Sequence, residues 1–261
     1  MTAAKSIIDD VTEPLATPAR IAFAGDWHMN AAWAVAAIRH AAEGRADVIV
    51  HVGDFGYTFD GRFMRRLDAA LRGAGLPLLF VDGNHEDFDS LLRWPIRANG
   101  LRQLTDHIWH LPRGFRWTWG GVRLMAVGGA HSVDRQWRTP GTSWWHDETL
   151  TDDDVVRAVA GGPVDVLIAH DCPAGVDIPG LATTSHLWPA DELVLANEHR
   201  QRLRTVVDAA RPTAVFHGHY HRRYSTTADL GYGPVAVVGL DCDGTTFDRN
   251  LTLVDLDDLL S

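Results

Sequence analysis

The sequence predicts an α/β fold whose centre is a largely parallel β-sheet, and two observations support this. Short apolar runs of strand length alternate with helix-forming segments along the first part of the chain, which is the pattern of parallel strands joined by right-handed crossovers. Residues 78–81 form one such run, and it stops just before Gly83. An apolar run without polar alternation is expected where a strand is buried on both faces, as in a parallel sheet.

The amino-terminal elements follow this alternation in order. The first strand leads into an alanine-rich segment of good helix formers that closes at Gly44, a residue typical of helix C-caps. Another strand and another helix then carry the chain to the run described above. The expected elements of this part are strand 21–25, helix 31–43, strand 48–52, helix 62–71 and strand 78–81.

After residue 86 the pattern changes from crossovers to hairpins. Gly120 and Gly121 lie between two strand-like runs and predict a tight turn, so antiparallel pairing is expected here. A loop rich in glycine, tryptophan and arginine spans 128–150, and loops of this length are usually functional or disordered. The remaining expected elements are helix 89–94, strands 108–111, 116–119 and 122–127, helix 152–160, strand 164–169, helix 191–210, and strands 214–216, 235–240 and 251–256.

Composition limits the class of protein. With 261 residues, of which 46% are hydrophobic, the chain can bury a large core without disulfides. We expect residues 1–18, which are polar and punctuated by proline, to form a tail, and residues 19–261 to form a single domain. Cys172 and Cys242 form no CxxC pair, which favours a reducing compartment. Because neither a signal-peptide pattern nor a long apolar span is present, a cytoplasmic protein without membrane contact is expected.

Side chains with metal-binding groups follow the apolar runs, at the points where the expected strands end. Parallel strands of an open α/β sheet place their carboxyl ends at the edge where ligands bind. The donors are carboxylate and amide oxygens and imidazole nitrogens without thiolates, and such a set suits Zn, Mn, Fe, Co or Ni in a site that is not structural zinc. These ligands are too many for one ion, whereas two divalent ions bridged by Asp54 would leave positions open for water and substrate. The candidate ligands are Asp26, His28, Asp54, Asn84, His170, His219 and His221.

The charge of such a site favours an anionic substrate. Two divalent cations bring four positive charges, and Asp26, Asp54 and a bridging hydroxide remove three, so a net positive centre remains for phosphate. The neutral Asn84 preserves this surplus. His85 then stands beside the ligands without binding metal, and it is available as a proton donor.

Five sequence blocks together resemble those of the calcineurin-like metallophosphoesterase superfamily. A D-x-H or a G-D alone occurs by chance in many proteins, but all five blocks occur in order, each after an apolar run, from Ile21 to about His221. The blocks are Asp26-x-His28, Gly53-Asp54, Gly83-Asn84-His85-Glu86, His170 and Gly218-His219-x-His221.

The resemblance implies a fold, a cofactor and a reaction. The fold would be a four-layer αββα sandwich, in which two mixed β-sheets are flanked by helices, and residues 19–261 would form one metallophosphoesterase domain. The cofactor would be two divalent metal ions, manganese first, with iron, zinc, nickel or cobalt as alternatives. As a phosphatase or phosphodiesterase, the protein would hydrolyse phosphomonoesters or phosphodiesters by in-line attack of a hydroxide that bridges the metals, with His85 as general acid. The implied ligand sets are Asp26, His28, Asp54 and His221 for one metal, and Asp54, Asn84, His170 and His219 for the other.

The loop 128–150 is the candidate for substrate selection. Arg135 and Arg138 can contact phosphate oxygens, and His131 can touch the substrate. In the alternative interpretation, the tryptophans of the loop form a small core and its acidic residues neutralise the arginines. Because the formal net charge is −10, a small phosphoester or a phosphorylated protein is expected rather than a long nucleic acid, and the oligomeric state is left open.

The alternative function is that of a non-catalytic relative, whose fold serves as a scaffold for protein–protein interaction. Such relatives typically lose the catalytic histidine or several ligands, whereas His85 and the ligand set are complete here. Glu86 has two interpretations, since it can orient His85 and raise its pKa or cap the helix that follows. His51 and His217 lie in or beside strands and are expected to pack in the interior.

Overall fold

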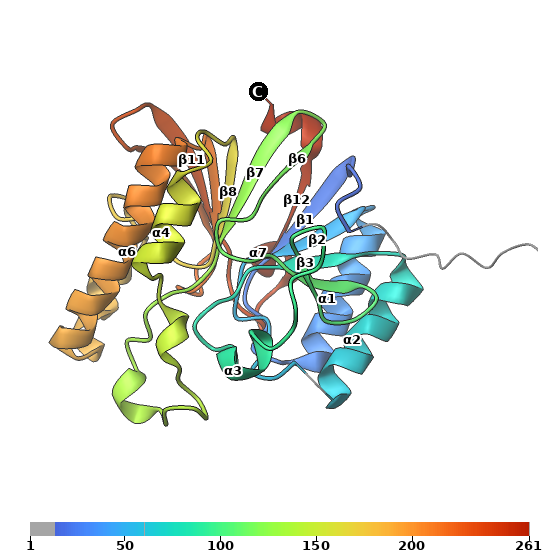
Figure 1. The fold of residues 1–261 in the computed structure, drawn as a ribbon, viewed down its shortest axis with the longest axis horizontal. Coiled ribbons are helices and arrows are strands. Elements are labelled where there is room, and N and C mark those ends of the chain that lie inside the picture. The colour runs from blue at the N-terminus through green and yellow to red at the C-terminus, as the bar shows by residue number, and fades with distance from the viewer. Residues whose placement is uncertain (1–13, 60, 261) are drawn as a thin grey trace, which may run out of the picture.

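Two six-stranded β-sheets face each other and carry helices on their outer sides (Figure 1). The structure is a computed structural model, and it describes residues 14–59 and 61–260. Residues 1–13 of the expected tail lie outside this description. Leu15 packs against the core between the sheets, and its carbonyl oxygen accepts a hydrogen bond of 3.0 Å from the Trp119 indole.

Both sheets share one plan, with parallel strands in the centre and an antiparallel strand at each edge. The spatial order of the first sheet is β12 (Leu251–Asp255), β1 (Arg20–Ala24), β2 (Val48–His51), β3 (Leu78–Phe80), β5 (Ile108–His110) and β4 (Arg102–Gln103). The order of the second sheet is β10 (Tyr224–Asp229), β11 (Pro234–Gly239), β9 (Ala214–His217), β8 (Val166–Ala169), β7 (Val122–Val127) and β6 (Arg116–Trp119).

Helices cover the outer face of each sheet and complete four layers. The first sheet packs against α1 (Ala31–Glu43) and α2 (Gly61–Ala74), and the second against α4 (Asp152–Val159) and α6 (Ala190–Ala210) (Figure 1). The expected αββα sandwich of two mixed sheets is therefore confirmed. No helix of the described residues is long and apolar enough to cross a lipid bilayer. The short helices are α3 (Phe88–Leu91), α5 (Leu181–Thr184), α7 (Phe247–Asn250) and the 3₁₀ helices η1 (Arg135–Trp137), η2 (His146–Glu148), η3 (Ser185–Leu187) and η4 (Leu256–Leu259).

Alternating side chains of the central strands fill two different cores, which explains their uninterrupted apolar sequences. In β1, Ile21 and Phe23 point into the core between the sheets, whereas Ala22 and Ala24 face the helices. Phe23 stacks on Phe216 of the opposite sheet, with ring centroids 3.8 Å apart. Because side chains alternate between the two faces of a strand, a strand covered on both faces has no position for a solvated residue.

Two strands and the short helices α5 and α7 were not expected from the sequence, and one expected helix is shorter than predicted. The edge strand β10 was missed because alternate side chains of its sequence YSTTAD are exposed and few are apolar, and β4 is only 2 residues long. The expected helix 89–94 is the shorter α3, which Asp87 caps by accepting a hydrogen bond of 2.9 Å from the Ser90 amide. These elements are too short or too polar for periodicity to indicate them.

Arg113 joins the end of the first sheet to the 128–150 loop and to α4. Its guanidinium donates to the Asp82 carboxylate at 2.6 and 2.8 Å and to Asp154 at 3.3 Å, and it also donates to loop carbonyl oxygens. Asp82 is 2% exposed. Acting against burial, Arg113 and His110 hold the pKa of Asp82 well below its usual range. The interior thus contains a charged carboxylate that depends on Arg113.

Replacing this arginine is expected to destabilise the fold. Arg113→Ala should lower the free energy of unfolding by about 3–5 kcal/mol, because it leaves the Asp82 carboxylate buried without its main partner. Urea denaturation measures this change. The matched variant Arg123→Ala breaks an Arg–Asp pair that is largely exposed to solvent, and it should change stability little. Equal losses in the two variants would contradict the role given to Arg113.

Candidate metal centre

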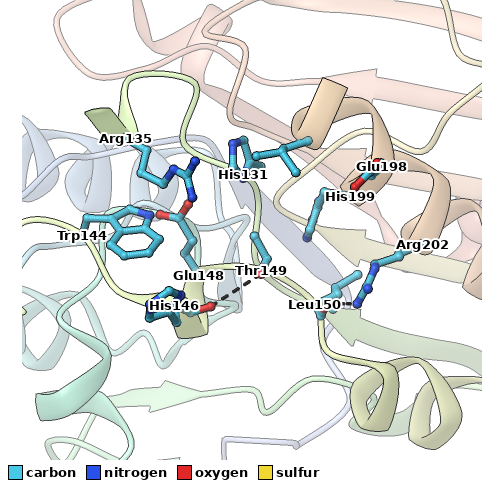
Figure 2. Close-up of a pocket in the computed structure, with 11 residues that line it drawn as sticks. His131, Arg135, Trp144, His146, Glu148, Thr149, Leu150, Glu198, His199 and Arg202 are labelled. Carbon is cyan, nitrogen blue, oxygen red and sulfur yellow. Dashed lines mark hydrogen bonds between the residues drawn. The ribbon is translucent and has the colours of Figure 1, made fainter. Parts of the chain in front are cut away.

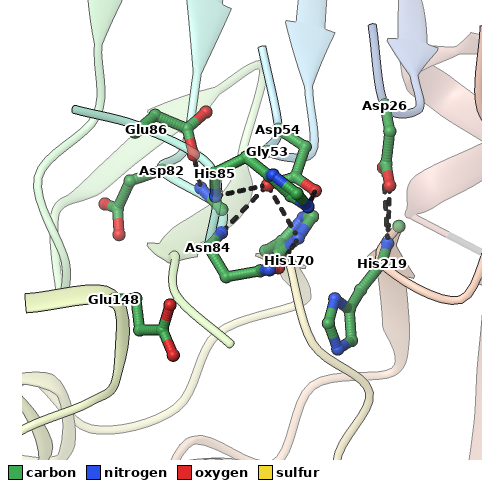
Figure 3. A network of polar contacts seen from close by, with 12 residues as sticks. Asp26, Gly53, Asp54, Asp82, Asn84, His85, Glu86, Glu148, His170 and His219 are labelled. Atoms are coloured by element: carbon green, nitrogen blue, oxygen red, sulfur yellow. Dashed lines mark hydrogen bonds and ion pairs between the residues drawn. The ribbon is translucent and has the colours of Figure 1, made fainter. Parts of the chain in front are cut away.

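The candidate ligands meet where the strand ends of the two sheets come together (Figure 3). Strands β1, β2 and β3 of the first sheet and β8 and β9 of the second all deliver polar residues to this edge. The convergence follows from the parallel centre of each sheet, because parallel strands end on the same side. In chain order the residues are Asp26 and His28 after β1, Asp54 after β2, Asn84 and His85 after β3, His170 after β8, and His219 and His221 after β9.

Two glycines allow the backbone to pass close to the ligand carboxylates. A Cβ atom at Gly83 would overlap Oδ1 of Asp54, and a Cβ atom at Gly218 would overlap Oδ1 of Asp26. Any larger residue would have to displace a carboxylate. The glycines of these two sequence blocks are therefore required by close approach.

Several ligands are held in a backbone conformation that side chains rarely adopt. The φ angles of His28, Asp54, His219 and His221 are 45°, 53°, 67° and 51°. A left-handed conformation at a residue other than glycine costs about 1–3 kcal/mol and persists where the surrounding structure imposes it. Such strain gathers at functional sites, and here it gathers at the predicted ligands.

Asp26, His28, Asp54 and His221 form a compact group. One ligand atom of each lies within 4.8 Å of the corresponding atoms of the others. Nε2 of His221 is 3.1 Å from Oδ2 of Asp26, and Nε2 of His28 is 3.5 Å from Oδ2 of Asp54. Ligands that each lie about 2.0–2.2 Å from one ion are at most about 4.4 Å apart. Small movements of these side chains would therefore let the group hold a single divalent ion.

A second group of acceptors converges beside the first. Nδ1 of His170 donates to the Val52 carbonyl oxygen at 2.9 Å, which leaves its Nε2 facing Oδ1 of Asn84 at 3.1 Å and Oδ1 of Asp54 at 3.3 Å. The His219 ring lies edge-on to the His170 ring, with centroids 5.1 Å apart. Oδ1 of Asp54 thus faces the second group while Oδ2 faces the first, which is the placement a bridging carboxylate requires.

The electrostatics of the site favour cations between these groups. Asp26 and Asp54 are buried, yet neighbouring histidines hold the pKa of both carboxyls below the usual range. Although burial opposes protonation, these carboxylates raise the pKa of His28 to about 9 and that of His170 to about 10. Positive charge is therefore stabilised here, either as protons on the rings or as divalent ions, and the donor set of oxygen and imidazole nitrogen fits such ions.

Asp243 orients one of the candidate ligands. Its carboxylate accepts a hydrogen bond of 2.9 Å from Nδ1 of His28, so that Nε2 of the ring faces the site. A carboxylate behind a metal-binding histidine fixes its tautomer and direction. Asp243 was not predicted from the sequence, although it follows the apolar run of β11 and the strand-end pattern could have indicated it.

A buried relay fixes the side-chain amide of Asn84. Its Nδ2 donates to Oγ of Ser132 at 3.0 Å, and Oγ of Ser132 donates to Oε2 of Glu148 at 2.6 Å. The Ser132 backbone amide donates to the other Glu148 oxygen at 2.9 Å. Burial raises the pKa of Glu148 to about 7. The relay turns the Asn84 carbonyl oxygen towards His170, and its two members in the 128–150 loop were also missed from sequence.

Loss of this relay should weaken metal binding. Ser132→Ala removes the acceptor of the Asn84 amide, so the amide can rotate and present its NH₂ group to the site. Metal affinity is expected to fall by about 10–100-fold, as for other residues that orient metal ligands. Competition with a metal-sensitive dye measures the affinity, and Ser225→Ala, at an exposed position of β10, is the matched control. Unchanged affinity in Ser132→Ala would show that Asn84 needs no such support.

His85 and Arg138 lie together at the mouth of the site. Nε2 of His85 is 3.8 Å from Oδ2 of Asp54 and accepts a hydrogen bond of 2.8 Å from Nη2 of Arg138. Arg138 also pairs with Asp134 at 2.8 Å. Burial, together with the positive charges of Arg138 and His28 and against the charge of Asp54, lowers the pKa of His85. Arg138 therefore lies where it could meet a substrate bound beside His85.

The other two candidates for substrate contact lie elsewhere. Arg135 and His131 both bind Glu192 of α6, at 2.9 and 2.7 Å. Both line a separate cavity, whose volume is about 230 Å³, and Figure 2 shows them near Trp144. Of the three residues proposed from sequence, only Arg138 lines the same cavity as the candidate metal ligands. Spacing along a loop does not reveal which arginine turns inward.

Glu86 does neither of the things expected from the sequence. Its carboxylate accepts hydrogen bonds of 2.8 Å from the Phe55 and Gly83 amides, and Asp87 caps the helix that follows. Burial, reinforced by the charge of Asp54, raises the pKa of Glu86 to about 8. Both interpretations were wrong because the side chain turns inward and joins the two loops that carry Asp54 and Asn84.

His51 and His217 are buried, as expected. The His51 ring packs edge-on against Trp27 with centroids 4.6 Å apart, and Nε2 of His217 is 2.6 Å from the Tyr224 hydroxyl. Nδ1 of His51 also accepts a hydrogen bond of 3.2 Å from the Gly53 amide, next to Asp54.

The fold is an αββα sandwich, and residues that could hold a divalent metal ion converge at its strand ends. A family model described as calcineurin-like phosphoesterase matches residues 19–223. The chain belongs to this family, and it is thus a phosphoester hydrolase of the kind that uses divalent metals.

Solved structures agree with this assignment at the level of the fold. A dimetal phosphatase from Danio rerio is similar with a TM-score of 0.56 and 13% identity, covering 92% of this chain and 93% of its own. A protein from Thermus thermophilus is similar with a TM-score of 0.53 and 13% identity, covering 92% and 99%. No curated protein sequence matches the chain.

Proposed function

We propose that this chain is a dinuclear-metal phosphoesterase that hydrolyses phosphomonoesters or phosphodiesters. The observation that carries the proposal is the position of Asp54, whose two carboxylate oxygens face two neighbouring groups of ligands. One metal would be held by the compact group that includes Asp26 and His221, and the other by the group that includes Asn84 and His170. Manganese is the first candidate, and iron, zinc, nickel and cobalt suit the same donors.

The bound ions would supply Lewis-acid stabilisation of the phosphoryl charge and a water of lowered pKa. The remaining steps fall to the chain's own residues. Arg138 is held by Asp134 and by His85, so a phosphate entering the cavity would offer its guanidinium a stronger, charge-assisted partner than the imidazole. Transfer of Arg138 to the phosphate would free Nε2 of His85 to take up a proton from water, and His85 could then donate this proton to the departing ester oxygen.

The first test measures metal and activity in the same sample. Protein loaded with Mn²⁺ should contain about two ions per chain, as the two ligand groups around Asp54 require, and it should hydrolyse p-nitrophenyl phosphate or bis-p-nitrophenyl phosphate. Preference between the two substrates distinguishes a monoesterase from a diesterase. Stable binding of one ion or none, or loaded protein without activity on either ester, would count against the proposal.

A further inference from the structure

The cavity that contains the candidate metal ligands is much larger than a phosphoryl group needs. Its volume is about 750 Å³, and one end is lined by Asp54, Asn84, His85, His219 and His221. Pockets of about 300–1,000 Å³ typically enclose a whole small organic molecule. The remaining space therefore extends away from the metal centre, between α6 and the segment that precedes it.

The far end of the cavity has a largely apolar wall. Ile178, Leu181, Leu193 and Ala196 contribute to it, and Ile178 is buried. Arg200 also lines this end, but its guanidinium is occupied by the carbonyl oxygens of the 172–176 segment at 3.0–3.3 Å. The wall therefore offers mainly apolar contact, although Asp177, Asn197 and Arg222 also line the cavity.

Large apolar side chains stand exposed at the rim of this end. Leu187 is 61% exposed and Trp188 is 37% exposed, and both line the cavity. Trp137, which precedes Arg138 in the 128–150 loop, is 64% exposed, and its ring lies 6.0 Å from the Trp188 ring. A cluster of exposed apolar side chains is uncommon and marks a place where a ligand or a partner binds. Here the cluster is continuous with the metal centre.

We infer that the substrate is a phosphoester whose organic group is bulky and apolar, an alkyl or aryl group that lies along this wall while the phosphate binds at the metal end. The inference rests on the proposed function and specifies its substrate class. Leu187 and Trp188 would then determine specificity by covering the organic group, and they would take no part in the chemistry.

Chain length is the variable that tests this inference. We would measure kcat/KM of the Mn²⁺-loaded enzyme for n-alkyl phosphates from methyl to octyl, and for the matching n-alkyl p-nitrophenyl phosphodiesters. The reactivity of the ester oxygen is alike along each series, so a rise of kcat/KM with chain length would report apolar contact between the alkyl group and the cavity wall. Each fully buried methylene should increase kcat/KM by about fourfold until the cavity is filled.

Binding without turnover provides an independent measurement. Calorimetry should show that n-octylphosphonate binds the loaded enzyme more tightly than methylphosphonate does, with a more negative heat-capacity change, because apolar surface is buried. The indoles of Trp137 and Trp188 should report the longer ligand by a change in fluorescence.

The rim variants are Leu187→Gln and Trp188→Gln, and the matched control is Val194→Gln. Val194 is 58% exposed on α6 and does not line the cavity. The rim variants should keep the activity on methyl esters and flatten the dependence on chain length, whereas the control should retain it. All three positions are exposed, so the substitutions should leave the fold intact.

The outcomes separate the inference from the proposed function. Hydrolysis that rises with chain length, and that flattens in the rim variants alone, supports the inference. Hydrolysis that is independent of chain length in the unaltered enzyme overturns the inference and leaves the phosphoesterase standing. Absence of turnover in both series overturns both. A dimer that dissociates in the rim variants while the dependence on chain length survives would assign the rim to a second copy of the chain and overturn the inference.

Discussion

Asp54→Asn is expected to lower kcat/KM by about 10³-fold or more and to reduce the metal content. The reason is that Asp54 presents one oxygen to each ligand group. A neutral amide offers one weak oxygen ligand in place of two charged ones, and stabilisation of phosphoryl charge by metals is worth several kcal/mol. Elemental analysis and steady-state kinetics on the same preparation measure both effects.

Asparagine is chosen because it removes the charge of Asp54 without adding backbone strain. The φ of Asp54 is 53°, and asparagine tolerates this conformation about as well as aspartate, so the fold should persist. Asp106→Asn is the matched control, because this carboxylate is 75% exposed and far from the ligands in sequence. If Asp54→Asn kept both ions and full activity, the bridging role would have to be abandoned.

His85→Gln should lower kcat by about 10²–10⁴-fold while leaving the metal content unchanged. His85 is next to Asn84, yet its Nε2 faces Arg138 and lies 3.8 Å from Asp54. Glutamine can still accept the hydrogen bond from Arg138 but cannot deliver a proton as an acid. The loss should be larger for esters with basic leaving groups than for nitrophenyl esters, since nitrophenolate leaves without a proton.

This dependence on the leaving group distinguishes a proton donor from a residue that only shapes the site. His146→Gln, at an exposed position in the 128–150 loop, is the matched control and should behave like the unaltered enzyme. A parallel loss of metal in His85→Gln, or an equal loss for all leaving groups, would assign His85 a structural role.

The strands, the layers and the clustering of ligands could be predicted because they depend on short-range patterns. An apolar run indicates a strand, and parallel strands bring their ends together, so Asp26, Asp54 and His170 could be placed at one edge from sequence alone. The five sequence blocks also resemble those of a known family, and this resemblance led to the prediction of the second β-sheet.

Residues that act through side-chain direction could not be predicted in this way. Ser132 and Glu148 are separated from Asn84 along the chain, and only the path of the 128–150 loop brings them behind it. Arg135 and Arg138 are three residues apart in sequence, yet Arg135 binds Glu192 whereas Arg138 donates a hydrogen bond to His85. The role of Glu86 could not be predicted because one of the groups it contacts, the Phe55 amide, is distant along the chain.

The two β-sheets contribute unequal but complementary ligands, because Asp26, His28, Asp54 and Asn84 come from one sheet and His170, His219 and His221 from the other. An ion that binds ligands from both sets would cross-link the two β-sheets. Its binding would add to the contacts that join the two halves, which are apolar packing and polar links such as that of Arg113 to Asp82 and Asp154. A ligand that binds only the folded state stabilises that state by an amount that grows with the logarithm of the ligand concentration once this exceeds the Kd. The stability of the fold would thereby depend on the supply of metal.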